Sequence, residues 1–359
     1  MASTFILLKQ MNYMKNQELG FAKSQLMVVR VKEAPVRKNL GSIKTELLRN
    51  PYILKVSASD SVPGNVPNFL TLNQQGRPEN NSHSVDVIYS DYDFSKTYGI
   101  KIQHGRDFSK VYPSDAQGVF LVNEMAAQKI GLATDAVGRR IGFAPDQMKE
   151  IVGVMKDFHY KSLRDKIGPL VVLLAPDRMA SWGNYLSIKI QAGKISGTVE
   201  FVKNLFATKS EREFDYFFAD ENFNALYRNE ERLGVIISVF AALAIFVACL
   251  GLFGLAAYAI EQRNKEIGIR KVLGASEARI IFMLSRGFAK QVILANLLAW
   301  PLTYYFMAEW LRDFAYKTTL SWSPFLATGL ASLVIAMFTV SFQALRAARM
   351  NPVQSLRSE

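Results

Sequence analysis

The stretch that decides the fold is "GVIISVFAALAIFVACLGLFGLAAYAI", residues 234–260, which contains no charged side chain. A helix of this length extends for roughly 40 Å, whereas the hydrocarbon core of a bilayer is about 30 Å thick. Two further apolar runs follow, at 291–308 and 325–345. One such run is compatible with a buried core helix, but three runs with basic flanks favour membrane spans. The sequence therefore predicts an all-α, three-helix transmembrane domain over residues 233–359.

The positions of the basic residues predict how these spans are oriented. The segment 261–290 is rich in Lys and Arg, whereas the segment 309–319 balances its basic residues with acidic ones. Cytoplasmic segments of membrane proteins carry an excess of Lys and Arg. We therefore expect the segment 261–290 and the C-terminal tail in the cytoplasm, and residues 1–232 outside the membrane.

Residues 1–232 have the pattern of a water-soluble α+β domain. The β-branched runs "LMVVRV" (26–31) and "ILKVSAS" (53–59) enclose a helix predicted between Pro35 and Pro51. A second strand, helix, strand unit begins at "YLSIKIQ" and ends at "FDYFFAD", and further strands are predicted at "VDVIYS", "GVFLVN", "EIVGVM" and "PLVVLLAP". A helix from Asp220 to Arg232 is acidic at its start and basic at its end. We expect it to continue into the first span as a rigid stalk.

Composition excludes several classes of function. The net charge of +12 could suggest a nucleic-acid partner. Half of this charge is spread over residues 1–233 without forming a basic cluster. The other half lies in residues 234–359, where the basic residues flank the apolar runs, as in membrane proteins. The single cysteine, Cys249, excludes an internal disulfide framework and a cysteine metal cluster. We therefore expect neither a nucleic-acid partner nor a bound metal.

The segment "EQRNKEIGIRKVLGAS", residues 261–276, superficially resembles a phosphate-binding loop. Five residues rather than four separate Gly268 from Gly274, and Ala275 stands where the lysine of G-x-x-x-x-G-K-[ST] belongs. The chain also offers no paired carboxylates and no Ser/His or metal constellation. We therefore predict that the chain itself is not an enzyme and binds no nucleotide cofactor.

The same segment has the pattern of a helix, a tight turn and a second helix. Its apolar and basic side chains fall on opposite faces of the first helix, as Ile269, Val272 and Leu273 against Arg270 and Lys271. Gly274 suits the position after a helix C-terminus, and Ser276 with Glu277 suits the start of the next helix.

The first span also carries small residues at spacings of three and four. They are Ala241, Ala244, Ala248, Gly251 and Gly254. Such residues share one side of a helix and permit close approach of a neighbouring helix. The alternative is a face of the helix that contacts lipid.

Several motifs resemble one known family. The segment 261–276 and the C-terminal "QALRAARMNPVQSLRSE" closely resemble the FtsX/MacB family of ABC transporter permeases. "YGIKIQHGRDFS", "VFLVNEMAAQKIG", "IVGVMKDFHY" and "FNALYRNEERLG" resemble the MacB-like periplasmic core domain of Bacteroidetes-type members. The resemblance extends over nearly the whole chain.

This resemblance implies a bacterial inner-membrane permease that transmits ATP-driven movement to a periplasmic domain and takes part in export. It implies a separate cytoplasmic ATPase that binds ATP, a second permease unit in a homodimer or a tandem or heterodimeric pair, and periplasmic or outer-membrane export components as further candidate partners. It places the following residues at or near the ATPase-docking surface: Glu266, Ile267, Gly268, Arg270, Lys271, Leu273, Gly274 and Ala275.

One feature departs from the family pattern. Members have four spans per unit, one of them before the periplasmic domain, and "FILLKQM" (5–11) looks like the end of such a span. The resemblance therefore implies a truncated permease or the second half of a tandem one. The alternative function is a membrane sensor or scaffold whose extracytoplasmic domain binds a ligand.

Overall fold

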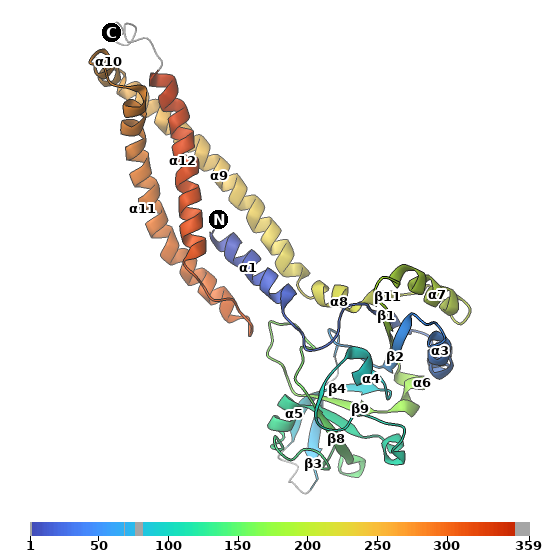
Figure 1. Ribbon diagram of the computed structural model, residues 1–359. Coiled ribbons are helices and arrows are strands. Elements are labelled where there is room, and N and C mark those ends of the chain that lie inside the picture. The colour runs from blue at the N-terminus through green and yellow to red at the C-terminus, as the bar shows by residue number, and fades with distance from the viewer. Residues whose placement is uncertain (1, 68, 76–81, 349–359) are drawn as a thin grey trace. The chain divides into compact units, whose positions relative to one another are not determined.

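The computed structural model describes residues 2–67, 69–75 and 82–348 (Figure 1). Its contacts divide the chain into two units, residues 16–228 and residues 2–15 with 229–348. The first, called here the α+β unit, holds all the described strands, and the second, the all-α unit, is helical. The predicted fold class, an α+β domain followed by three long apolar helices, is confirmed.

The described strands of the α+β unit form one connected sheet. They are β1 (Leu26–Arg30), β2 (Ile53–Ser59), β3 (Phe69–Gln74), β4 (His83–Ser90), β5 (Ile102–Gly105), β6 (Phe120–Asn123), β7 (Arg140–Gly142), β8 (Lys149–Met155), β9 (Leu170–Leu174), β10 (Tyr185–Ile190) and β11 (Tyr216–Phe218).

Short helices connect these strands. They are α2 (Ala34–Lys38), α3 (Leu40–Leu47), α4 (Phe94–Tyr98), α5 (Glu124–Lys129), α6 (Met179–Trp182), α7 (Ile195–Ala207) and α8 (Ala219–Ala225), with the 3₁₀ helices η2 (Pro113–Gln117), η3 (Pro145–Gln147) and η4 (Pro176–Arg178).

The pairing of the strands closes part of the sheet into a ring. The order β4-β3-β7-β8-β6-β9 returns to its start, because β9 pairs with β4 in parallel. All six strands contribute to one buried cluster, with Leu72, Val87, Phe120, Ile141, Ile151 and Val171 as one member from each. This six-strand ring therefore has its own core.

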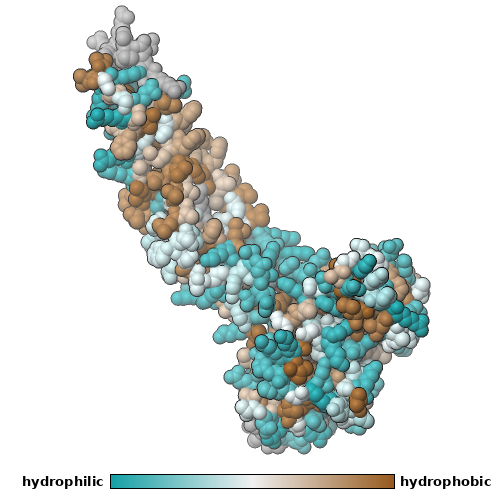
Figure 2. All heavy atoms as spheres, viewed as in Figure 1, coloured by the Kyte–Doolittle hydropathy of each residue, from teal (hydrophilic) through white to brown (hydrophobic). Residues whose placement is uncertain are grey.

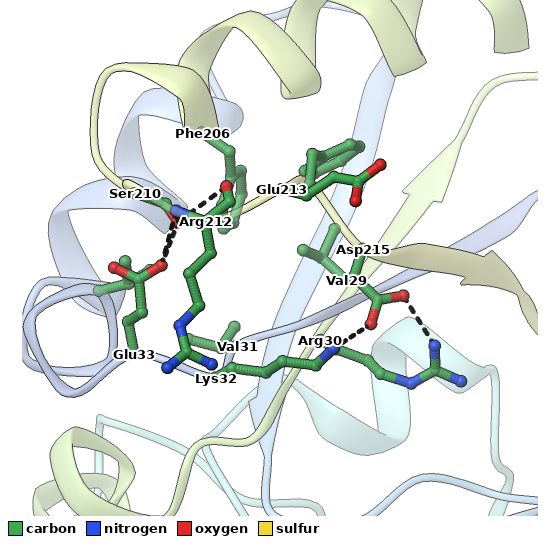
Figure 3. A pocket seen from close by; sticks show the side chains of 12 residues that line it. Val29, Arg30, Val31, Lys32, Glu33, Phe206, Ser210, Arg212, Glu213 and Asp215 are labelled. Carbon is green, nitrogen blue, oxygen red and sulfur yellow. Dashed lines mark hydrogen bonds and ion pairs between the residues drawn. The ribbon is translucent and has the colours of Figure 1, made fainter.

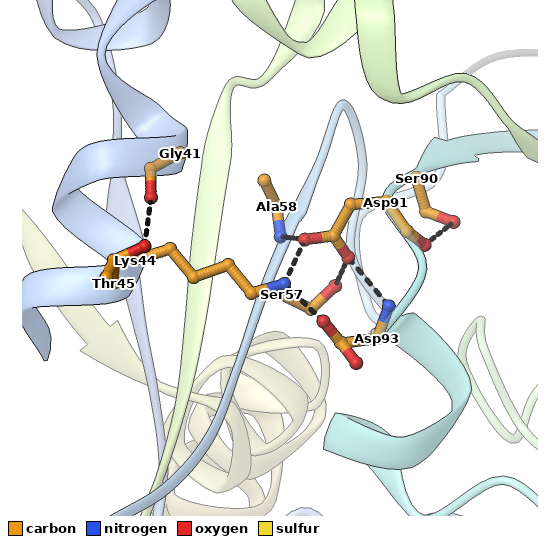
Figure 4. A network of polar contacts seen from close by, with 8 residues as sticks. All are labelled: Gly41, Lys44, Thr45, Ser57, Ala58, Ser90, Asp91 and Asp93. Atoms are coloured by element: carbon orange, nitrogen blue, oxygen red, sulfur yellow. Dashed lines mark hydrogen bonds and ion pairs between the residues drawn. The ribbon is translucent and has the colours of Figure 1, made fainter. Parts of the chain in front are cut away.

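Strand β5 pairs with β8 of the ring, and the other four strands form an antiparallel sheet, β11-β1-β10-β2, next to the ring. Helices α3 and α7 pack on this sheet through Ile43 and Val202. Lys44 of α3 lies 2.6 Å from Asp91 and 2.5 Å from Asp93, and the Ser57 hydroxyl donates to Asp91 over 2.7 Å (Figure 4). Because Asp91 directly follows β4, this network links the sheet to the ring.

Several predicted elements differ from the observed ones. The helix expected between Pro35 and Pro51 is divided at Asn39, whose side-chain amide donates to the Pro35 carbonyl over 3.0 Å and so competes with the backbone ladder. Strands β3, β5 and β7 were not predicted.

The all-α unit consists of α1 (Ala2–Asn16), α9 (Arg228–Gln262), α10 (Asn264–Val272), α11 (Glu277–Arg312) and α12 (Ser323–Ala348). By length and composition, α9, α11 and α12 can each cross a membrane, and they contain the three predicted spans. Figure 2 shows hydrophobic residues gathered along these helices. Helix α11 begins at Glu277 and continues through Pro301, so it includes residues 277–290 as well as the predicted span 291–308.

The predicted stalk is interrupted. Helix α8 ends at Ala225, and Leu226 and Tyr227 form a turn before α9 begins. The Tyr227 side chain is buried within the α+β unit, where its hydroxyl accepts a hydrogen bond from the Leu163 amide over 2.9 Å. Holding this side chain in the α+β unit ends the helix there, so the expectation of one unbroken helix is wrong.

The N-terminal residues also differ from the prediction, which placed 1–232 in one domain. Residues 2–15 group with the long helices. Gln10 of α1 is fully buried, its amide donates to the Tyr316 carbonyl over 2.8 Å, and its oxygen accepts from the Thr318 amide over 2.8 Å. These contacts to the segment between α11 and α12 explain why α1 belongs to the all-α unit.

Candidate functional site

The charged segment folds as the helix, turn and helix that its sequence indicates. Gly274 adopts φ 87°, and the amides of Gly274 and Ala275 donate to the carbonyls of Lys271 and Arg270 over 3.0 and 2.9 Å. Gly274, in this left-handed backbone conformation, ends α10. Ser276 caps α11 by accepting a hydrogen bond from the Arg279 amide. The predicted positions of Gly274 after the helix C-terminus and of Ser276 at the start of the next helix are confirmed.

One side of α10 is held in the interior of the all-α unit. Ile267 is 5% exposed, and it packs in a cluster with residues from α9, α11 and α12, namely Ile260, Ile280, Leu284 and Ala344. Gly268 beside it is also buried. This cluster fixes which face of α10 points outward.

The outward side of α10 is apolar at its end. Ile269, Val272 and Leu273 are 52%, 66% and 80% exposed. A groove of about 450 Å³ lies between the turn and the first turns of α11, lined by Arg270, Leu273, Gly274, Ala275, Arg279, Ile280, Phe282, Met283 and Arg286. Exposed apolar side chains beside arginines are typical of a surface that a partner protein covers.

The predicted docking residues therefore lie in different environments. Arg270, Leu273, Gly274 and Ala275 line the groove, whereas Ile267 and Gly268 lie in the interior. Glu266 forms an ion pair with Arg270 over 2.7 Å, and Lys271 is half-buried. An exposed pair at this spacing contributes only about 0.3–0.5 kcal/mol, so it orients Arg270 more than it stabilises the helix.

The prediction missed the side of the groove that α11 provides. Arg279, Phe282, Met283 and Arg286 recur at spacings of three and four, which places them on one face of a helix. The same periodicity is visible in the sequence from Arg279 to Arg286, but the predicted docking residues end at Ala275.

The small residues of α9 lie mainly on its exposed surface. Ala244, Ala248, Gly251 and Gly254 are exposed, and Ala241 is half-buried. A Cβ atom added at Gly251 or Gly254 would meet no atom within 4 Å among the described residues. This face is therefore open to a neighbouring helix or to lipid.

A second cluster of charged side chains lies where β1 and the segment after α7 meet (Figure 3). Asp215 lies 2.8 Å from Arg30 and 2.6 Å from Lys32. The hydrogen bond from Lys32 lowers the pKa of Asp215, and the smaller effect of burial opposes it. The space enclosed is about 20 Å³, enough for about one water molecule and far below the roughly 150 Å³ of a cavity that binds benzene. The cluster is structural.

Each of the two units matches a known protein family. Residues 2–199 match the MacB-like periplasmic core domain, and residues 238–352 match the FtsX-like permease C-terminal family.

Individual relatives are distant. The macrolide export ATP-binding/permease protein MacB of Sodalis glossinidius is 23% identical over 90% of this chain and 50% of its own length. The pyoverdine export ATP-binding/permease protein PvdT of Pseudomonas putida is 23% identical over 79% of this chain and 44% of its own length. The chain spans about half the length of the curated relatives it matches.

Among solved structures, the periplasmic region of MacB from Actinobacillus actinomycetemcomitans aligns with a TM-score of 0.41 at 15% identity, over 58% of this chain and 94% of that one. The two family matches together extend over most of the sequence and, apart from residues 2–15, follow the two units of the structure. This chain belongs to the FtsX/MacB-type family of ABC transporter permeases.

Proposed function

We propose that this permease couples ATP hydrolysis by a separate cytoplasmic ATPase to movement of its α+β unit, as part of an export system. The observation that carries the proposal is the exposed apolar end of α10, where Leu273 is 80% exposed beside the arginines of the groove. Leaving such a surface in water is unfavourable, and apolar anchors ringed by arginine are frequent at protein interfaces. An ATPase with an acidic rim around an apolar hollow would complement this groove.

The packing of Ile267 supports a coupling role. It joins α10 to α9, α11 and α12 in one buried cluster, so a displacement of α10 must be shared by these helices or break the cluster. Helix α9 begins at Arg228, the last residue of the α+β unit. Since a turn at Leu226 and Tyr227 interrupts the path, we infer that motion is transmitted through a jointed connection.

The names of the relatives support an association with an ATPase, because they combine ATP binding with permease function. The two families that this chain matches are a periplasmic core domain and a permease domain. We therefore propose that an ABC ATPase subunit provides the ATP binding. The relatives are named as export proteins, and we propose that this chain also takes part in export. We assign no cargo to it.

We further propose that the chain lies in the bacterial inner membrane, with residues 16–228 in the periplasm, the C-terminus in the cytoplasm and a second permease unit against α9. The exposed small residues around Ala248 support that contact. A cysteine at Ala248 in a Cys249→Ala background should form disulfide-linked dimers. Failure to cross-link under oxidation would assign this face to lipid.

The ATPase contact can be tested by photo-cross-linking in native membranes. A photoreactive residue at Leu273 should capture a subunit that mass spectrometry identifies as an ABC ATPase. The matched control is Val111, which is 82% exposed in the α+β unit and should capture none. Equal recovery at both positions, or no ATPase at Leu273, would reject the docking role and favour a membrane sensor or scaffold.

A further inference from the structure

A second cavity lies at one end of the six-strand ring. Strands β4, β7 and β9 end there, whereas β6 and β8 begin there. Its volume is about 210 Å³, and its lining includes Tyr89, Phe120, Phe143, Lys149, Asp177 and Arg178. The mouth of a closed ring of strands is a frequent place for a small-molecule site.

The walls of this cavity are aromatic and held in place by their neighbours. The Phe120 and Phe143 rings meet edge to face with centroids 5.6 Å apart. Tyr89 packs against Trp182 in the same manner at 4.8 Å. Phe120 is fully buried, while Tyr89 and Phe143 are half-buried and so present part of their rings to the cavity.

Two cationic side chains line the same cavity. The Lys149 ammonium donates a hydrogen bond to the Gln117 carbonyl, and the Arg178 guanidinium lies 4.7 Å from the centre of the Trp182 ring. Neither forms an ion pair with a carboxylate of the described residues, although Asp177 also lines the cavity. Burial lowers the pKa of Lys149, and the positive charges of Arg178 and Arg140 lower it further. Repulsion between these cations would be relieved by an anion.

Gly118 keeps the backbone close to the lysine. It adopts φ 90°, and a Cβ atom there would lie 2.9 Å from the Lys149 ammonium and 3.0 Å from the Leu174 carbonyl. A larger residue would therefore displace the lysine from its position in the cavity.

We propose that this cavity binds a small amphipathic anion, with an apolar ring against Tyr89 and Phe143 and a carboxylate or phosphate between Lys149 and Arg178. The size agrees with such a ligand, because a cavity of about 150 Å³ accommodates a benzene ring and the additional volume admits one anionic substituent. This binding site is separate from the ATPase groove and does not depend on the proposed coupling function.

The test uses the full chain in lipid nanodiscs and 4-fluorobenzoate as the probe, observed by fluorine NMR. Saturable binding is expected for the unmodified chain, and it should weaken by about tenfold in Lys149→Met and in Arg178→Gln, since a hydrogen bond to a charged group is lost in each. Lys38→Met is the matched control, because Lys38 is exposed on α2 away from the cavity lining, and it should leave binding unchanged. The neutral 4-fluorobenzamide should not compete.

Several results would overturn the assignment. Equal affinity in Lys149→Met, Arg178→Gln and Lys38→Met would mean that the probe partitions into lipid only. Competition by the neutral amide would exclude recognition of charge. If Lys149→Met fails to fold, Arg178→Gln decides, because Arg178 is exposed. Leu273→Asp should bind the probe normally, so failure of the coupling proposal can be told apart from failure of this one.

Discussion

Ile267 and Leu273 belong to the same helix and turn, yet Ile267 is 5% exposed and Leu273 is 80% exposed. The resemblance to the permease family places both residues at or near the ATPase-docking surface. The structure gives them different environments: Ile267 attaches α10 to the long helices, and Leu273 presents an apolar side chain at the groove. A substitution at Ile267 should therefore reduce stability, whereas one at Leu273 should reduce docking of the ATPase.

Replacing Ile267 by alanine should destabilise the all-α unit. Removing a buried isoleucine side chain costs about 2–5 kcal/mol in protein cores. Thermal unfolding in detergent should show a clear loss of stability for Ile267→Ala. Ile269→Ala is the control, because Ile269 is 52% exposed and its loss should change stability by no more than about 0.5 kcal/mol. Similar losses in both would contradict the assigned burial.

Replacing Gly274 and Gly287 by alanine should change stability in opposite directions. A Cβ atom at Gly274 or Gly287 would meet nothing within 4 Å, so only the backbone distinguishes them. At Gly274, with φ 87°, Gly274→Ala should cost about 1–2 kcal/mol. In the helical interior, Gly287→Ala should stabilise by about 0.5–1 kcal/mol. Hydrogen exchange of the α10 and α11 amides measures both; equal effects would show that the left-handed turn does not close α10.

The turn between α10 and α11 also shows what can be predicted from the sequence. The turn at Gly274 and the cap at Ser276 depend on local backbone chemistry, so their residue types were sufficient. The pairing of β3 with β7, at Asn73 and Gly142, brings together segments distant in sequence. Neither "FLTLNQ" nor "RIG" carries a strong strand pattern, and long-range packing selects both. The six-strand ring and the cavity at its end were therefore not predicted.

Stability of the α+β unit should decrease at low pH through Asp115. Its side chain is fully buried, with both oxygens 2.7 Å from the Arg106 guanidinium and one also 3.0 Å from the Ser109 amide. Burial raises the pKa of Asp115, but the hydrogen bonds from Arg106 and Ser109 and the charge of Arg106 outweigh it, so the pKa is lowered. A lowered pKa means that the stabilisation is complete above the ordinary aspartate pKa and is lost as pH falls through the folded-state value.

Asp115→Asn should remove part of this pH dependence. At neutral pH it should also cost about 3 kcal/mol, because Arg106 loses its charged partner. Hydrogen exchange of peptides from residues 16–228, followed between pH 7 and pH 3, measures both effects. Arg139 and Asp135 form an exposed pair, so Asp135→Asn serves as the control with little change. An unaltered pH profile in Asp115→Asn would show that another carboxylate controls acid stability.

The proposed orientation predicts which engineered cysteines react in intact cells. In a Cys249→Ala background, Ser82→Cys should react with a membrane-impermeant maleimide from outside. Ser276→Cys should react only with a reagent that enters the cytoplasm. Both positions are exposed, so access through the membrane decides the result. Labelling of position 276 by the impermeant reagent would reverse the orientation.

The central claim is that the exposed end of α10 is the contact with an ATPase, and Leu273→Asp tests it most directly. A carboxylate in an apolar contact should weaken docking by at least about 2 kcal/mol, roughly thirtyfold in affinity. The measurement is stimulation of ATP hydrolysis by the copurified ATPase, in membranes holding equal amounts of each permease. Val111→Asp, at a position 82% exposed in the α+β unit, is the control. The account predicts lost stimulation in Leu273→Asp with unchanged thermal stability and normal stimulation in Val111→Asp; normal stimulation in Leu273→Asp would contradict it.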